Sequence, residues 1–175
     1  QVLQALAYKL DVFSEYEQFN IINTIMSHPP EQNSATALAL VERLNTSTNR
    51  HAKCAILGVL TCNGFNQNTQ VLLTFISKLG IFTDENFQKI ISAAINIGTF
   101  GTEPQVLLAL ANKLNIFTYA PAQTLIISAI RENKFGQDAQ VLLALMNKLN
   151  IFTDEGDKEI VESIIISMLK NNNNS

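Results

Sequence analysis

The sequence predicts an all-α protein: an α-solenoid in which five antiparallel helix-turn-helix hairpins, about ten helices, stack into a superhelix. The first observation is a repeat. The stretch 105–118, QVLLALANKLNIFT, returns at 140–153 with a single change, Met146 in place of Ala111. A looser copy, QVLLTFISKLGIFT, occupies 70–83, again 35 residues away. Self-similarity at a fixed spacing of this length is typical of stacked-repeat proteins.

The repeat divides the chain into units. Counting back from the two best copies gives 1–34, 35–69, 70–104, 105–139 and 140–170. The first unit is one residue short, and we place the missing residue in the loop around 29–33, because loops tolerate changes of length. We expect a single repeat domain over 1–170. The Asn-rich tail, 171–175, is expected to be disordered because it has no apolar side chains to pack.

The second observation is that each unit begins with apolar residues at helical spacing, as Leu6 and Leu10 illustrate. We predict first helices over about 1–11, 35–45, 70–80, 105–115 and 140–150. Asn or Gly follows, the residues that most readily form a left-handed C-cap. These are Asn45, Gly80, Asn115 and Asn150. A Phe comes next in four units, and we expect these rings to pack between hairpins: Phe13, Phe82, Phe117 and Phe152.

The third observation is a Ser or Thr that can cap a second helix in each unit. In the first unit, Ser14 and Glu17 have the spacing of a capping box. We predict second helices over about 15–28, 49–62, 84–97, 119–132 and 154–170. Their apolar residues come as adjacent pairs, such as Ile90-Ile91, which we assign to the core. Small residues beside these pairs would let hairpins approach closely: Thr24, Gly58, Ala93, Ser128 and Ser163.

The composition argues against several classes of protein. With 47 % hydrophobic residues the chain can bury a core, so wholesale disorder is not expected. The net charge is −3 and no run of basic residues occurs, which argues against a general affinity for nucleic acid or anionic lipid. No apolar run reaches the roughly 18 residues that span a bilayer, and no signal sequence is apparent, so we expect no membrane partner. Because Gln1 lies at a repeat boundary and is not Met, we expect further repeats upstream in a longer protein.

The cysteines and histidines do not suggest a catalytic or metal site. Cys54 and Cys62 would lie about 12 Å apart in a helix, too far for a disulfide, so we expect free thiols in a reducing compartment, the cytoplasm. His51 and Cys54 are one turn apart, but a structural zinc site needs four ligands brought close together. No nucleophile has a His–acid partnership, and no Gly-rich phosphate loop occurs. We therefore expect no metal, no cofactor, no catalytic residue and no enzymatic activity.

Candidate partner-binding residues lie on the second helices, where the copies differ while the core positions hold. Positions spaced i, i+3 and i+7 align from unit to unit into one row, and solenoids bind extended partners along such rows. Its candidate members are Asn20, Asn23, Ser27, Leu57, Thr61, Lys89, Ser92, Asn96, Thr124, Ile127, Arg131, Glu159 and Glu162. Leu57 and Ile127 would suit apolar anchors. The alternative is a solvated face that is free to drift.

The segment 124–154, TLIISAIRENKFGQDAQVLLALMNKLNIFTD, resembles the pentatricopeptide repeat. Its 35-residue period, its helix-turn-helix form, the core around Leu125-Ile126 and the turn at Gly136 all agree. Tetratricopeptide units share most of these features but have a period of 34 residues. The pentatricopeptide resemblance implies a reader of single-stranded RNA, one base per repeat. It also implies base-reading positions at Phe19, Lys53, Gln88, Gln123 and Lys158.

We therefore predict a non-enzymatic scaffold that binds a protein or peptide along the row of second helices. One alternative is a divergent pentatricopeptide-like binder of single-stranded RNA. Another is a structural array that self-associates through exposed faces of its end repeats.

Overall fold

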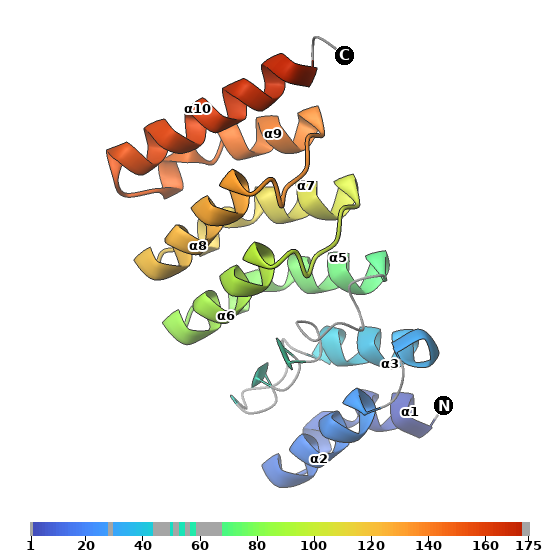
Figure 1. Cartoon of the computed structure of the whole chain (residues 1–175). Helices are drawn as coiled ribbons and strands as arrows, with labels where there is room; N and C mark the ends of the chain where they lie inside the picture. Colours follow the sequence, from blue (N-terminus) through green and yellow to red (C-terminus); the bar gives the residue numbers. More distant parts are fainter. Residues whose placement is uncertain are drawn as a thin grey trace. The chain divides into compact units, whose positions relative to one another are not determined.

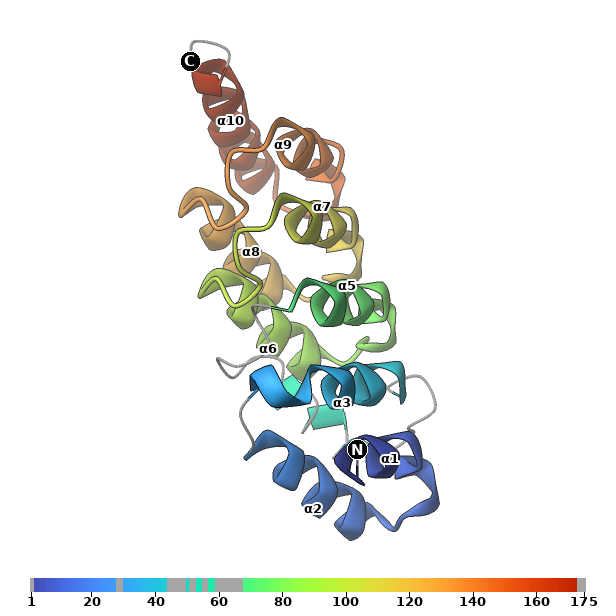
Figure 2. The ribbon, with the colours of Figure 1, turned by 90° about the vertical axis from the view of Figure 1, so that its right-hand side faces the viewer.

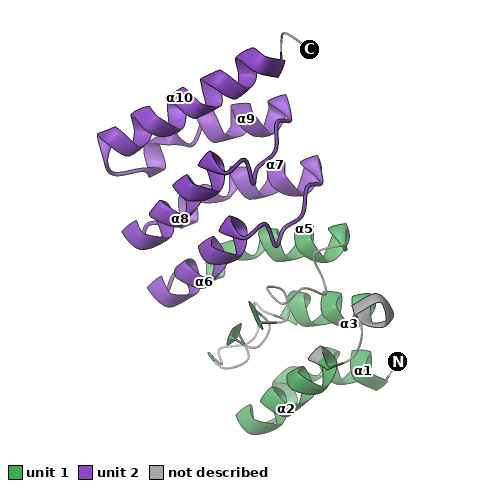
Figure 3. Cartoon of the chain, viewed as in Figure 1, with its two compact units in different colours: residues 1–81 green, residues 82–175 purple. Residues whose placement is uncertain are grey.

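The computed structural model describes residues 2–27, 30–43, 50, 53, 54, 57, 58 and 68–172. Every regular element in this part of the chain is helical (Figure 1), so the predicted all-α class is confirmed. The predicted second helix over 49–62 falls mostly outside the described residues. The chain divides into two compact units, each of which spans more than one sequence repeat. Unit 1 covers residues 1–81 and unit 2 covers residues 82–175 (Figure 3). From here on, "unit" refers to these two parts and "repeat" to the sequence repeats.

In unit 1 the first helices of neighbouring repeats pack on one another. Its elements are α1 (Val2–Tyr8), the 3-10 turn η1 (Leu10–Val12), α2 (Glu15–Met26), α3 (Pro30–Arg43), α5 (Thr69–Ser77) and the 3-10 turn η2 (Leu79–Ile81). Helix α3 packs against both α1 and α5, and α2 contacts α1 and α3. Leu10, Ile22 and Leu40 are buried in this core. At its edge Arg43 lies 3.8 Å from the Asp11 carboxylate and thereby joins α3 to η1.

Unit 2 contains two layers of helices. Its elements are α6 (Glu85–Asn96), α7 (Pro104–Asn112), η3 (Leu114–Ile116), α8 (Ala120–Arg131), α9 (Ala139–Met146), η4 (Leu149–Ile151) and α10 (Glu155–Asn172). The first helices α7 and α9 pack together, and the second helices pack in the order α6, α8, α10 (Figure 2). Phe82, Phe117 and Phe152 are at most 2 % exposed, which confirms that these rings belong to the interior.

The first helices end differently from our prediction. We expected left-handed caps at Gly80, Asn115 and Asn150, but all three lie inside 3-10 turns, η2, η3 and η4. A tighter turn satisfies the last carbonyl groups through i→i+3 hydrogen bonds, so no left-handed residue is needed. Among the described residues, positive φ angles instead follow the second helices, at Gly98, Gly101, Asn133 and Gly136.

Side-chain caps begin α2 and α6, whereas α8 follows Tyr119, whose side chain makes no capping hydrogen bond. The capping box of α2 is confirmed, because the hydroxyl and the backbone N–H of Ser14 donate to the Glu17 carboxylate over 2.7 and 2.9 Å. These two bonds, the hydroxyl's first, lower the pKa of Glu17 from its ordinary value of 4.5. In α6 the cap is Asp84 and not Thr83, the residue before it, which is the Ser or Thr expected to cap the second helix of that repeat. Phe82 is two residues before its cap Asp84, whereas Phe13 directly precedes its cap Ser14. The residue missing from the first repeat is therefore missing from this turn and not from around 29–33, where α3 begins at Pro30.

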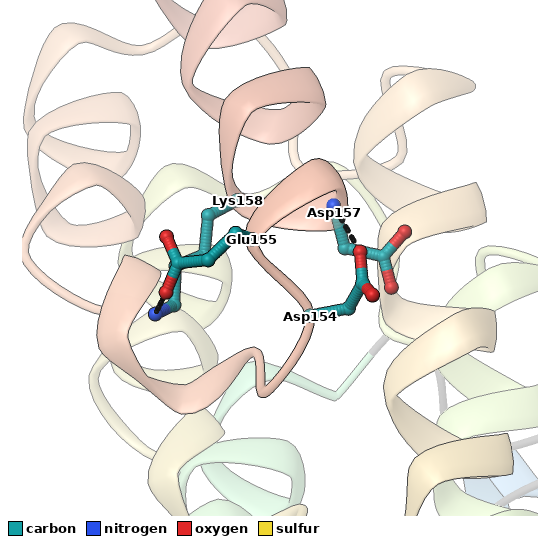
Figure 4. Close-up of polar contacts among 4 residues, drawn as sticks. All are labelled: Asp154, Glu155, Asp157 and Lys158. Carbon is teal, nitrogen blue, oxygen red and sulfur yellow. Dashed lines mark hydrogen bonds and ion pairs between the residues drawn. The ribbon is translucent and has the colours of Figure 1, made fainter.

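Helix α10 begins with a capping carboxylate, as α6 does, and at 18 residues it is longer than α2, α6 and α8, which have 12 each. At its start the Asp157 N–H donates to the Asp154 carboxylate over 3.0 Å, and Lys158 pairs with Glu155 (Figure 4). At its end the helix continues to Asn172, two residues into the tail that we expected to be disordered. The side-chain amide of Asn172 donates to the Gln137 carbonyl just before α9, which gives these asparagines a tertiary contact. Residues 173–175 lie outside the described part of the chain.

Candidate interaction surface

The row predicted on the second helices divides into exposed and inward-facing residues. The exposed members are Asn20, Asn23 and Ser27 in unit 1, and Lys89, Thr124, Arg131, Glu159 and Glu162 in unit 2. We call the five in unit 2 the polar row. Asn96 is half-buried, and its side-chain oxygen accepts no hydrogen bond within the described part of the chain. Thr61 lies outside the described residues.

Three predicted members of the row are buried, and the prediction is wrong for them. Leu57, Ser92 and Ile127 are 1 %, 0 % and 5 % exposed, so none can contact a partner without rearrangement. A residue at i+3 is turned about 60° around the helix from residue i, and in α6 and α8 this turn leads to a covered side of the helix, whereas Glu162, at the same position of α10, is exposed. Leu57 and Ile127, which we expected to act as apolar anchors for a partner, are core residues.

A second row, which the sequence analysis assigned to the core, is on the surface. Ile90 and Ile160 are 41 % and 43 % exposed, and Leu125, at the same position of α8, is half-buried. We call these three residues the apolar row. Each directly precedes a fully buried residue, and one step along a helix is a rotation of about 100°, so only one of each adjacent pair can face the core. Spacing alone does not distinguish the two members, because Ile90 and Ile91 are each followed four residues later by a buried apolar residue, Ala94 and Ile95.

Two buried glutamines connect successive repeats inside unit 2. The side-chain oxygen of Gln88 accepts hydrogen bonds from the backbone N–H groups of Thr118 and Tyr119 over 3.0 and 2.9 Å. The side-chain amide of Gln123 donates to the carbonyl groups of Phe117 and Ile151 over 2.9 and 2.8 Å. Gln88, in α6, therefore holds the turn before α8, and Gln123, in α8, holds the turn before α10. Gln18 makes the bond within its own repeat, to the Phe13 carbonyl over 2.8 Å.

Gln88 and Gln123 are also two of the five positions that the pentatricopeptide resemblance implies for reading bases. Gln88 and Gln123 are 3 % and 5 % exposed, and their amide groups are engaged by backbone. Lys158 is half-buried beside Glu155, and Lys53 is half-buried. Phe19 is the exposed member of the set, at 45 %. The structure therefore does not present the five positions as one accessible series.

The described residues contain no group of three or more His, Cys, Asp and Glu side chains that could hold a metal ion. They also contain no helix with the length and apolar content needed to cross a membrane. Cys54 is an exposed free thiol.

No protein-family model, curated protein or solved structure matches this chain. The fold and the surface define it as an all-α protein in which like helices of successive repeats pack together within each unit.

Proposed function

We propose that this chain is a non-enzymatic helical-repeat scaffold that binds a protein or peptide partner along its second helices. In this proposal the packing of like helices on like helices continues through all the sequence repeats, as an α-solenoid of five hairpins. One observation carries the proposal: three consecutive second helices of unit 2 present the apolar row beside the polar row. Repetition of both kinds of side chain at matched positions suits a partner that lies across several helices.

The two rows would contribute differently to binding. Ile90, Leu125 and Ile160 offer apolar area that is already accessible, and removing such area from water is the main source of affinity in most complexes. The polar row changes charge from Lys89 on α6 to Glu159 on α10, so it would select among partners and affect the association rate. This assignment replaces the predicted anchors Leu57 and Ile127 with residues that a partner can reach.

Binding of single-stranded RNA is the alternative, and the surface supports it less well. The net charge is −3, and two of the implied base-reading residues, Gln88 and Gln123, already bond to backbone. RNA binding also has a distinctive salt response, because each phosphate neutralised adds to the loss of affinity with salt.

The test compares two variants that remove equal numbers of exposed apolar side chains. Ile90→Ser with Ile160→Ser alters the apolar row, whereas Val12→Ser with Leu143→Ser alters exposed residues elsewhere. Each immobilised protein is presented with a random peptide display library and, separately, with a random single-stranded RNA pool at two salt concentrations. We expect peptides selected on the natural sequence to lose roughly tenfold or more in affinity for the first variant only.

The outcomes separate the proposals. Peptides that bind both variants equally well would exclude the apolar row as the binding surface. Tight binding of the RNA pool, with affinity falling steeply as salt rises, would instead favour the RNA alternative.

A further inference from the structure

We propose that the outer face of α10 is a self-association surface, on which α10 of a second copy of this chain packs in the antiparallel direction. This inference does not rest on the proposed peptide binding. An open groove follows the helix, lined by Glu159, Glu162, Ser163, Ile166, Ser167 and Lys170. These residues recur at intervals of three and four, so they share one side of the helix. The opposite side holds Val161 and Ile165, both fully buried against the rest of unit 2.

Helix packing on this side of a second helix is already present within unit 2. Glu162 occupies the repeat position of Ser92 in α6 and Ile127 in α8, and both of those residues are buried in a unit where α6, α8 and α10 pack in succession. On α10 the same position is exposed. The middle of the groove, Ser163, Ile166 and Ser167, combines small side chains with one half-buried apolar residue, which suits close approach of another helix.

The charges select a second copy and the direction of its helix. Glu159 and Glu162 lie toward the start of the groove, and Lys170 lies at its end. Ile166 is four residues from both Glu162 and Lys170, so a two-fold axis through Ile166 would bring Lys170 of each copy opposite Glu162 of the other. A parallel pair would place glutamates against glutamates. The antiparallel arrangement also sets opposite helix dipoles side by side.

The association is expected to be weak. The groove occupies one face of one helix, whereas stable complexes bury roughly 1,200 Å² or more. We therefore expect a dissociation constant on the order of 100 μM.

Sedimentation equilibrium of the 175-residue chain, from about 10 μM to about 1 mM, tests the proposal. Glu162→Lys and Lys170→Glu each convert the two symmetric attractive contacts of the pair into repulsive ones. We expect either substitution alone to weaken association by roughly tenfold. The double variant Glu162→Lys with Lys170→Glu exchanges the two charges, so it should recover association close to that of the natural sequence. This recovery depends on the antiparallel register.

Controls make the result specific to α10. Tyr16→Ser changes a residue of unit 1 that is 75 % exposed and should leave association unaltered. Circular dichroism on every variant verifies that the helices are intact. A strict monomer at about 1 mM, a double variant that associates no better than the single ones, or an association that Tyr16→Ser abolishes would each overturn the proposal.

Discussion

Gln123 shows how much one side chain contributes inside unit 2. Its side-chain amide donates to the Phe117 carbonyl, in the turn before α8, and to the Ile151 carbonyl in the next repeat. The side chain is 5 % exposed. A buried carbonyl that loses its donor has no water to replace it, so removal of this amide leaves two acceptors unsatisfied.

We therefore expect Gln123→Met, which preserves the shape of the side chain, to lower the free energy of unfolding by about 2–4 kcal/mol. Urea denaturation followed by circular dichroism measures this change. Gln140→Met, on the exposed side of α9, is the matched control and should shift stability by less than about 0.5 kcal/mol. Equal effects of the two substitutions would show that the hydrogen bonds of Gln123 contribute little.

The capping box at the start of α2 makes a prediction about pH. Because Ser14 lowers the pKa of Glu17 in the folded state, the contribution of Glu17 to stability is present above its ordinary pKa of 4.5 and is lost as the pH falls through the lower folded value. Titration followed by nuclear magnetic resonance should give a pKa below 4.5 for Glu17 in the natural sequence.

Ser14→Ala should raise that pKa toward 4.5, since the hydroxyl bond is the larger cause of its depression. The control is Ser27→Ala, which removes a hydroxyl at the other end of α2, where Ser27 donates to the Thr24 carbonyl. It should leave the pKa of Glu17 unchanged. A pKa that does not respond to Ser14→Ala would contradict the capping box.

At the scale of the helices, the two kinds of turn make opposite demands on glycine. Gly136, in the turn after α8, has a φ of +70°, and a Cβ placed there would lie 3.6 Å from the Leu107 side chain. Gly80, inside η2, has no atom within 4 Å of such a Cβ, and its φ is outside the left-handed region. Residues with a Cβ are strained in the left-handed region, whereas glycine elsewhere only adds entropy to the unfolded chain.

We expect Gly136→Ala to destabilise the protein by about 1–2 kcal/mol. The same substitution at Gly80 should be neutral or stabilise by up to about 1 kcal/mol. Thermal denaturation of both variants under identical conditions measures the difference. If Gly80→Ala destabilised the protein as much as Gly136→Ala, the result would indicate that Gly80 adopts the left-handed C-cap conformation predicted from the sequence, and it would contradict the 3-10 turn.

Some helix boundaries could be predicted from the sequence, and the way the first helices end could not. The boundaries of α6, α8 and α2 were predicted to within two residues, because each has apolar residues at helical spacing and either a capping side chain or, in α8, a proline in the first turn. The same pattern could not show that the first helices tighten into 3-10 turns, since an Asn or Gly after a helix is compatible with either ending.

At the scale of the whole chain, the division into two compact units implies local rather than uniform changes in stability. When elements mainly contact their neighbours, a core substitution weakens its own surroundings first. Ile126 is 0 % exposed in α8, and replacing it by alanine should cost about 2–4 kcal/mol.

Native-state hydrogen exchange measures where that cost appears. With Ile126→Ala we expect protection to fall by roughly tenfold or more in α6, α8 and α10, with a smaller change in α1 and α3. Ile22→Ala, in α2, should give the reverse distribution and serves as the control. A uniform loss of protection along the described chain with either substitution would indicate a single cooperative unit.

The all-α class, most core positions and the capping box at Ser14 could be predicted from the sequence alone. Local spacing and side-chain chemistry are sufficient for these, because they depend on neighbours within a few residues. The sequence did not determine which residue of an apolar pair faces outward, as with Ile90 and Ile91. Nor did it show that Ser92 and Ile127 are buried, or that Gln88 and Gln123 bond to the next repeat. Those features depend on contacts between helices about 35 residues apart, and only the tertiary structure decides which side of a helix its neighbours cover.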